Sequence, residues 1–233
     1  MKYDPAKHHR RSIRLKGYDY SQAGAYFVTI CVQGRECRFG EVANDEMHLN
    51  EAGQMALAAW EALPQRFPTV ELDEFIIMPN HMHVIIVITS DNDVGATTRP
   101  AFGGVVVAPD WAGTTRAGTT RAGTRPAPTE EEAATARPTL GAIVGAYKSI
   151  TTDEYIRGVK HQSWPSFFKR VWQRNYHEHI VRNERELNAI RRYILNNPLK
   201  WALDRDNPQN IKHLPPPKTA ADYIADVQAR SQD

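Results

Sequence analysis

The segment EFIIMPNHMHVIIVIT, residues 74–89, contains two short apolar runs of β-forming residues joined by a Met-Pro-Asn turn. Side chains alternate between the two faces of a strand, so His81 and His83 project together while Met82 points the other way. The rise of roughly 3.3 Å per residue places the two imidazoles about 7 Å apart, close enough to share one metal ion. The β-branched run after them is typical of a strand buried on both faces. The histidine pair is therefore expected where a central strand leaves the core, although such a pair alone is more often two half-exposed histidines.

The composition is that of a soluble globular protein. The 233 residues are 41% hydrophobic and 24% charged, enough for one domain of ordinary size with extensions. No apolar run approaches the roughly 20 residues that span a bilayer, and the basic N-terminus lacks the apolar stretch of a signal peptide. We therefore expect a cytoplasmic protein with no membrane partner. Cys31 and Cys37 support neither a disulfide framework nor a cysteine zinc site, so reduced thiols are expected.

Basic residues cluster with aromatic ones, although the net charge is only +2. Nine basic side chains stand against three acidic ones between residues 157 and 192. Such a cluster suits a phosphate backbone with unstacked bases, and it is equally compatible with a solvated surface over core aromatics. The candidate phosphate contacts are Arg10, Arg11, Arg14, Lys148, Arg170, Arg174, Arg182 and Arg191. The candidate stacking residues are Trp164, Phe168 and Trp172.

Hydrophobic patterns predict strands mixed with helices. Strands are expected at 25–32, 38–42, 70–78 and 81–89, the first two forming a hairpin around a turn at 33–35. Helices are expected at 50–67, 139–157 and 183–197, with N-caps at Asn50 and Asn183 and breaks near Pro64 and Pro198. An extended segment is expected at 166–179. This order predicts an α+β fold, an antiparallel sheet with helices packed on it.

The composition changes between residues 90 and 138. Gly, Ala, Thr, Arg and Pro dominate, and an Ala-Gly-Thr-Thr-Arg unit repeats from Ala112. Such a segment buries too little apolar surface to offset its ordering entropy, so a disordered insertion without a catalytic role is expected. It interrupts a single domain, expected over 25–203, which follows a basic arm at 1–24 and precedes a polar tail at 204–233.

The last expected helix carries two polar residues on one face. Tyr193 and Asn197 are four positions apart and lie along the edge of the apolar stripe formed by Leu187, Ile190 and Ile194. Taken alone, such a tyrosine is most simply a boundary aromatic with a capped hydroxyl. An asparagine before proline is ordinary turn chemistry.

Three blocks of sequence, in this order, resemble the single-tyrosine HUH transposases, and most closely their REP-associated tyrosine transposase branch. The blocks are residues 78–83 (MPNHMH), 172–179 (WQRNYHEH) and 193–198 (YILNNP). The resemblance covers about residues 25–201 apart from the insertion. It implies a ferredoxin-like (RRM-like) HUH fold, an antiparallel sheet flanked by helices, which agrees with the pattern of elements above.

The resemblance also implies roles for residues. His81 and His83 correspond to metal ligands, Asn197 to a third, amide-type ligand, and Tyr193 to the nucleophile. The ion would be Mg²⁺ or Mn²⁺, whose open positions could take a phosphate oxygen. Such ligands also accept Zn²⁺, and the sequence does not choose among these metals.

Two further residues of the second block are candidates for the site. Tyr176 is the rival nucleophile. It ranks second because the residue four positions further on, Ile180, has no carboxamide side chain. His179 is a further candidate ligand or an orienting residue.

The implied activity is cleavage and rejoining of single-stranded or hairpin DNA through a 5′-phosphotyrosine intermediate. A phosphodiester is negatively charged with a poor leaving group, so attack needs charge neutralisation and an activated nucleophile. Two other classes stay open: a domesticated DNA-binding protein of the same fold without turnover, and a histidine–metal hydrolase without a covalent step. Insertion-sequence relatives work as dimers, so a homodimer also stays open.

Overall fold

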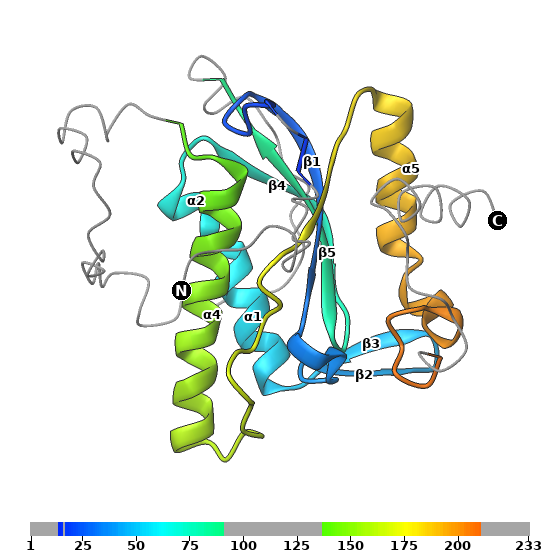
Figure 1. Cartoon of the computed structure of the whole chain (residues 1–233). Coiled ribbons are helices and arrows are strands. Elements are labelled where there is room, and N and C mark those ends of the chain that lie inside the picture. Colours follow the sequence, from blue (N-terminus) through cyan, green and yellow to red (C-terminus); the bar gives the residue numbers. More distant parts are fainter. Residues whose placement is uncertain (1–13, 16, 91–136, 211–233) are drawn as a thin grey trace, which may run out of the picture.

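The structure is a computed structural model that describes residues 14–15, 17–90 and 137–210 (Figure 1). The expected disordered insertion, apart from its ends, lies outside the described residues, as do most of the basic arm and the tail beyond residue 210. No described helix combines the length and the apolar character that a bilayer crossing requires. Both cysteines are free thiols.

A four-stranded antiparallel sheet is the central element. Its strands, in spatial order, are β4 (Val70–Ile77), β5 (His81–Ile88), β1 (Gly24–Cys31) and β6 (His177–Ile180). Strand β1 pairs along its whole length with β5, which places Thr29 opposite His83 and Cys31 opposite His81. The strands predicted at 25–32, 70–78 and 81–89 are therefore confirmed, and β4 and β6 form the two edges.

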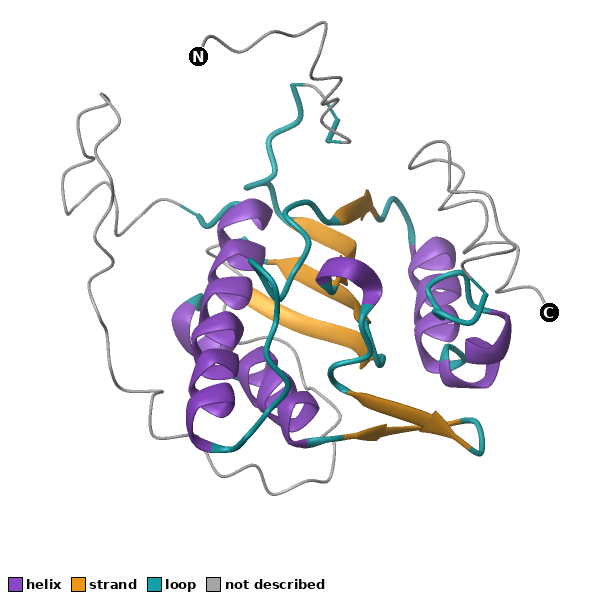
Figure 2. Cartoon of the chain, turned by 60° about the horizontal axis from the view of Figure 1, so that its bottom comes forward, coloured by secondary structure: helices purple, strands orange, loops and turns teal. Residues whose placement is uncertain are grey.

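Helices cover both faces of this sheet (Figures 1 and 2). On one face lie α1 (Glu51–Glu61), α2 (Leu63–Arg66) and α4 (Leu140–His161). On the other face lies α5 (Glu184–Leu195), followed by the 3₁₀ helix η3 (Pro198–Leu203). The predicted α+β fold with an antiparallel sheet flanked by helices is confirmed.

The alternation along β5 divides the core between the two faces. Met82, Val84 and Ile86 point into the larger cluster under α1 and α4. Ile85 points into the smaller cluster under α5, together with Phe27 and three residues of that helix. The histidines alternate in phase with Ile85, so the expected orientation of the pair away from Met82 is confirmed.

Capping and proline set the helix ends largely as expected. The Asn50 side chain accepts a hydrogen bond from the Gly53 backbone N–H (2.9 Å), and Asn183 accepts one from Glu186 (2.9 Å). The helix predicted over 50–67 splits at Ala62, because Pro64 occupies the first turn of α2, where its missing N–H is harmless. Helix α4 runs on to His161, beyond the predicted end at residue 157.

Two predicted elements are confirmed only in part. The segment at 38–42 does not pair with β1. Instead β2 (Gly40–Ala43) pairs with β3 (Glu46–Leu49) in a separate hairpin, whose turn residues Asn44 and Asp45 have φ of 52° and 62°. Asn and Asp tolerate this left-handed conformation, which gives the turn a twist that suits a tight hairpin.

The extended segment predicted over 166–179 contains only β6 and a single bridge between Val32 and Trp172. Its backbone carbonyls are taken by a side chain: the Lys148 ammonium donates to the carbonyls of residues 173 and 175 at 2.9 and 3.1 Å. Carbonyls that are satisfied in this way do not need a strand partner.

Candidate active site

The two imidazoles of β5 converge more closely than the strand repeat alone predicts. The Nε2 atoms of His81 and His83 are 3.1 Å apart and the ring centroids 4.6 Å apart, so the rings lean toward each other from their backbone positions. Their exposed fractions are 0% and 1%. A pair of ring nitrogens therefore meets at one buried point on the face covered by α5.

Asn80 sets the tautomer of His81. Its side-chain N–H₂ donates to the backbone carbonyls of Arg35 (2.9 Å) and Asp206 (2.7 Å), which leaves its oxygen 2.9 Å from Nδ1 of His81. An amide oxygen only accepts, so Nδ1 of His81 must carry the proton. Nε2 of His81 then presents a lone pair. No sequence pattern assigned a role to Asn80 beyond its place in the turn.

His83 is held by residues of β1. Its Nδ1 lies 2.8 Å from the Thr29 hydroxyl, and the Phe27 ring stacks on the imidazole with centroids 5.6 Å apart. A partner on the far ring nitrogen is the usual way in which a protein orients a metal-ligating histidine. Thr29 was not identified from the sequence, because the register that sets it opposite His83 is a property of the assembled sheet.

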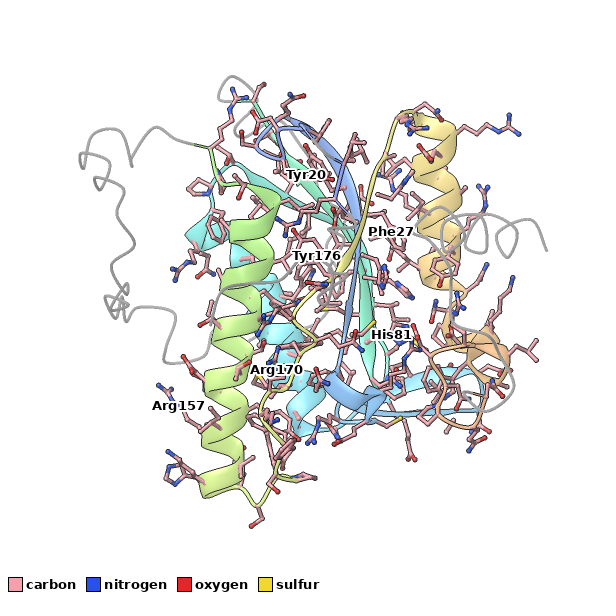
Figure 3. All side chains as sticks on the ribbon, viewed as in Figure 1. Tyr20, Phe27, His81, Arg157, Arg170 and Tyr176 are labelled. Atoms are coloured by element: carbon pink, nitrogen blue, oxygen red, sulfur yellow. The ribbon has the colours of Figure 1, made fainter. Side chains whose placement is uncertain are left out.

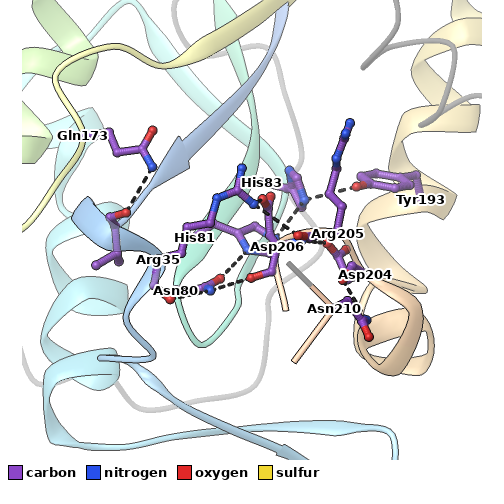
Figure 4. Close-up of polar contacts among 11 residues, drawn as sticks. Arg35, Asn80, His81, His83, Gln173, Tyr193, Asp204, Arg205, Asp206 and Asn210 are labelled. Carbon is purple, nitrogen blue, oxygen red and sulfur yellow. Dashed lines mark hydrogen bonds and ion pairs between the residues drawn. The ribbon is translucent and has the colours of Figure 1, made fainter. Parts of the chain in front are cut away.

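Tyr193 reaches the imidazole pair from α5. Its hydroxyl oxygen lies 3.2 Å from Nε2 of His83, and its ring meets those of His83 and Phe27 edge-on. Helix α5 buries Ile190, Tyr193 and Ile194 on one face, as the apolar stripe predicted. The structure thus brings together three residues that the sequence singled out (Figure 4).

Asn197 is buried one helical turn beyond Tyr193, at the start of η3, with 2% of its surface exposed. Its side-chain oxygen has no hydrogen-bond partner among the described residues. A buried amide oxygen left unsatisfied costs about 1–3 kcal/mol, so this atom suits a cation or a donor supplied from outside the chain.

The donor set fits a divalent metal. Metal–nitrogen bonds of about 2.0–2.1 Å, at angles near 90–109°, place two ligand nitrogens about 2.8–3.4 Å apart. The Nε2–Nε2 distance of 3.1 Å lies in that range. The described residues contain no group of three His, Cys, Asp or Glu side chains arranged to hold a metal. An ion here would therefore draw on the imidazole pair and on neutral oxygen ligands.

The structure does not bring Tyr176 or His179, the two other candidate residues, to the imidazole pair. Tyr176 lies on the opposite face of the sheet, in the cluster under α4 (Figure 3). Its hydroxyl accepts a hydrogen bond from Arg14 (2.6 Å), and burial raises its pKa to about 12. The His179 Nε2 atom lies 2.6 Å from a carboxylate oxygen of Glu186 on α5, a hydrogen-bonding contact directed away from the imidazole pair.

Several candidate DNA-contact residues form hydrogen bonds or ion pairs with other residues of the protein. Lys148 binds backbone carbonyls, and burial lowers its pKa to about 8. Arg191 pairs with Asp73 of β4. The buried Trp172 indole donates to the Thr151 hydroxyl at 2.8 Å. Two other candidates are also held internally: Trp164 donates to Glu51 (2.8 Å), and Arg14 donates to Tyr176.

Other candidates remain accessible to a ligand. Arg174 and Arg182 are exposed, and Arg170 is half-buried. Phe168 is 76% exposed, and the Lys169 ammonium lies 4.7 Å from its ring centroid. Arg10 and Arg11 lie outside the described residues. The DNA-contact assignment of these residues stays a prediction.

A segment that the sequence placed in the polar tail packs against the site. Asp204 and Asp206 are buried, and Arg35 forms an ion pair with Asp206. The Trp201 ring lies 6.0 Å from that of His81, centroid to centroid. Burial lowers the pKa of His81 to about 4; the Asp204 carboxylate opposes this shift, and Arg35 adds to it. No periodicity or motif in residues 204–207 predicted this placement.

Comparisons with known proteins give one relative over nearly full length. No family model matches the chain. An uncharacterized protein of Haemophilus influenzae (strain ATCC 51907 / DSM 11121 / KW20 / Rd) is 38% identical over 207 residues, 88% of this chain and 96% of that protein.

Two solved structures are similar at lower identity. A REP-associated tyrosine transposase bound to a REP hairpin has a TM-score of 0.46 and 16% identity, covering 80% of this chain and 73% of that one. A Deinococcus radiodurans protein assigned as a transposase has a TM-score of 0.36 and 15% identity, covering 78% and 95%.

Proposed function

We propose that this chain, which belongs to the same family as the Haemophilus influenzae protein, is a metal-dependent DNA strand transferase with Tyr193 as its nucleophile. It would cleave and rejoin single-stranded or hairpin DNA. One observation carries the proposal: the Tyr193 hydroxyl lies 3.2 Å from Nε2 of His83, and Nε2 of His81 lies 3.1 Å from that same atom. A nucleophile and a pair of metal-type donors therefore converge on one point.

His81 and His83 would hold the metal, with the Asn197 oxygen as a third ligand. When bound, Mg²⁺ or Mn²⁺ would neutralise charge on the phosphate and polarise one of its non-bridging oxygens. Zn²⁺ would suit the imidazoles as well. Asn80 and Thr29 fix the two ring orientations through the Nδ1 atoms, so the donor pair is organised before any ion arrives.

Tyr193 would supply the covalent step. Its phenolic oxygen forms a bond to phosphorus as the bond from phosphorus to the 3′ oxygen breaks. The phenol gives up its proton, and the departing 3′ oxygen takes one to become a 3′-OH. The resulting 5′-phosphotyrosine keeps a phosphodiester linkage, so attack by the 3′-OH of a second strand rejoins DNA without ATP.

The described arrangement is closed to DNA. The exposed fractions of His81, His83 and Tyr193 are 0%, 1% and 6%. Trp201 and the buried segment 204–207 pack beside the imidazoles, and the Arg35–Asp206 ion pair ties that segment to the end of β1. Access of a phosphodiester to the ring nitrogens therefore requires a change in this arrangement.

The full burial of both imidazoles favours a second candidate function, a DNA-binding protein of the same fold without turnover. Exposed Arg174, Arg182 and Phe168 would serve either function as contacts to phosphates and bases. The two candidates differ only in whether a covalent intermediate forms.

One assay separates these functions. End-labelled hairpin DNA is incubated with the protein and Mn²⁺ and run on a denaturing gel. A shifted covalent band that persists in Tyr176→Phe and disappears in Tyr193→Phe supports the strand transferase. DNA binding without a band supports the second candidate. Cleavage that Tyr193→Phe leaves unchanged would point to a metal hydrolase without a covalent step.

A further inference from the structure

Helix α5 is the only described α-helix on the imidazole face of the sheet (Figures 1 and 2). Five buried residues form its contact with the sheet: Phe27, Ile85, Ile190, Tyr193 and Ile194. Five partly buried apolar residues also pack against this cluster, but apolar contacts of this kind are non-directional. A second kind of contact is needed to fix where the Tyr193 hydroxyl points.

An ion pair ties the middle of α5 to β4. Arg191 Nε donates to one carboxylate oxygen of Asp73 at 2.8 Å, and Nη2 donates to the other, a two-pronged contact with defined geometry. Asp73 lies in the register shift of β4 between Leu72 and Phe75. Such a bulge re-aims a side chain away from the regular alternation, here toward the helix.

A hydrogen-bonded pair ties the N-terminal turn of α5 to β6. His179 Nε2 lies 2.6 Å from one carboxylate oxygen of Glu186. The other oxygen accepts a hydrogen bond from the Arg182 backbone N–H (2.8 Å), and the Glu186 N–H is capped by Asn183. The Glu186 side chain is thus fixed on both sides.

The two side-chain pairs hold opposite edges of the same sheet. Strand β4 is one edge and β6 the other, and the central strands β5 and β1 lie between them. Helix α5 is therefore fastened at both sides of the strand that carries His83. Arg191 is two residues from Tyr193, so this fastening acts close to the nucleophile.

We propose that the pairs Arg191–Asp73 and His179–Glu186 are positioning clamps that hold the Tyr193 hydroxyl over the imidazole pair. The proposal rests on the function proposed for Tyr193. In this proposal Arg191 and His179 orient α5, and they do not contact DNA or metal directly. Loss of a clamp should slow the covalent step and leave DNA binding nearly unchanged, because neither pair needs the ligand to form.

The test uses full-length Asp73→Asn and Glu186→Gln. Hairpin DNA affinity is measured by fluorescence anisotropy, and the rate of covalent adduct formation is measured in single turnover at saturating DNA with Mn²⁺. We expect the rate to fall roughly 10–100-fold, as for a nucleophile displaced by about 1 Å, with affinity within about threefold of wild type. An unchanged rate, or a rate and an affinity that fall in parallel, would overturn the proposal.

Two controls separate positioning from general damage. Glu154→Gln breaks the ion pair between Glu154 and Arg157 within α4, on the other side of the sheet, and should change neither quantity. The double variant Asp73→Arg/Arg191→Asp rebuilds the first clamp with its charges exchanged and should recover at least part of the rate. A loss in the Glu154 control equal to that in the clamp variants would count against a specific role.

A measurement that does not depend on catalysis tests the clamp proposal if the wild type forms no adduct and the proposed function is wrong. The ring resonances of His83 are followed by NMR, with Tyr193→Phe as the reference for a displaced phenol. If Asp73→Asn moves these resonances toward the reference, the clamp stands independently of turnover. If the His83 resonances stay at their wild-type positions, the clamp proposal is wrong.

Discussion

The Tyr193 hydroxyl oxygen lies 3.2 Å from Nε2 of His83, although 110 positions separate the two residues in the chain. The contact joins α5 to β5 within one copy of the protein. The proposed nucleophile and the proposed metal ligands therefore come from the same chain.

This arrangement predicts that the site does not need a second subunit. We expect a mixture of Tyr193→Phe and His83→Ala to form no covalent adduct with hairpin DNA, because neither copy holds a complete site. The measurement is the denaturing-gel assay on the mixture, beside wild type at the same total concentration. A covalent band in the mixture would show that the site is shared between two copies.

Thr29→Val should weaken metal binding without touching a ligand. The change removes the hydroxyl that lies 2.8 Å from Nδ1 of His83, and loss of such an orienting partner typically costs 10–100-fold in metal affinity, so roughly that loss is expected for Mn²⁺. The measurement is Mn²⁺ titration calorimetry.

Thr152→Val is the matched control for this experiment. Its hydroxyl donates to the Lys148 backbone carbonyl within α4, away from the imidazoles. Equal Mn²⁺ affinities in Thr29→Val and wild type would contradict the assigned role.

Stability should depend on pH through His81. Burial lowers its folded-state pKa from 6.5 to about 4, so the unfolded chain binds a proton first as the pH falls. This contribution to stability is complete above pH 6.5 and is lost progressively between pH 6.5 and about 4. Urea unfolding of metal-free protein at pH 7 and pH 5 should show a steeper loss for wild type than for His81→Asn. Parallel losses would exclude His81 as the titrating group.

Lys148→Met should lower stability and leave the electrostatics of DNA binding unchanged. The Lys148 ammonium donates to the carbonyls of Gln173 and Asn175, and leaving such acceptors unpaired costs about 1–3 kcal/mol. Urea unfolding measures this loss. The salt dependence of hairpin binding should keep its wild-type slope.

Arg174→Ala provides the contrast. Arg174 is exposed, and removal of one phosphate contact should reduce the salt slope of DNA binding by about 1, with stability unchanged. A reduced slope in Lys148→Met, or an unchanged one in Arg174→Ala, would reverse the two assignments.

Much of the fold could be predicted because short-range backbone geometry controls it. The two-residue repeat of a strand placed His81 and His83 together on one face and Met82 on the other. Asn50 and Asn183 cap their helices, because a side-chain oxygen there meets the free N–H groups of the first turn. These features depend on residues only a few positions apart.

The pairing of 38–42 could not be predicted in the same way. The segment has the composition of a strand, but the chain reverses at Asn44 and Asp45 and pairs it forward with β3. Strand β1 is already paired on both sides by β5 and β6, which leaves it no free edge. Composition indicates a strand, whereas the partner depends on which edges the rest of the fold leaves open.

By itself, the amino-acid sequence determined the strand and helix periods, the histidine pair on one strand face, and Tyr193 on the last α-helix with Asn197 just beyond its end, because neighbouring residues set these through backbone geometry. Only the tertiary structure decided that Tyr193 meets His83 while Tyr176 lies on the opposite face of the sheet. It also decided that Asn80 sets the His81 tautomer and that Arg191 and His179 fasten α5. Contacts between residues far apart in the chain depend on how the helices pack on the sheet, and no local pattern encodes that packing.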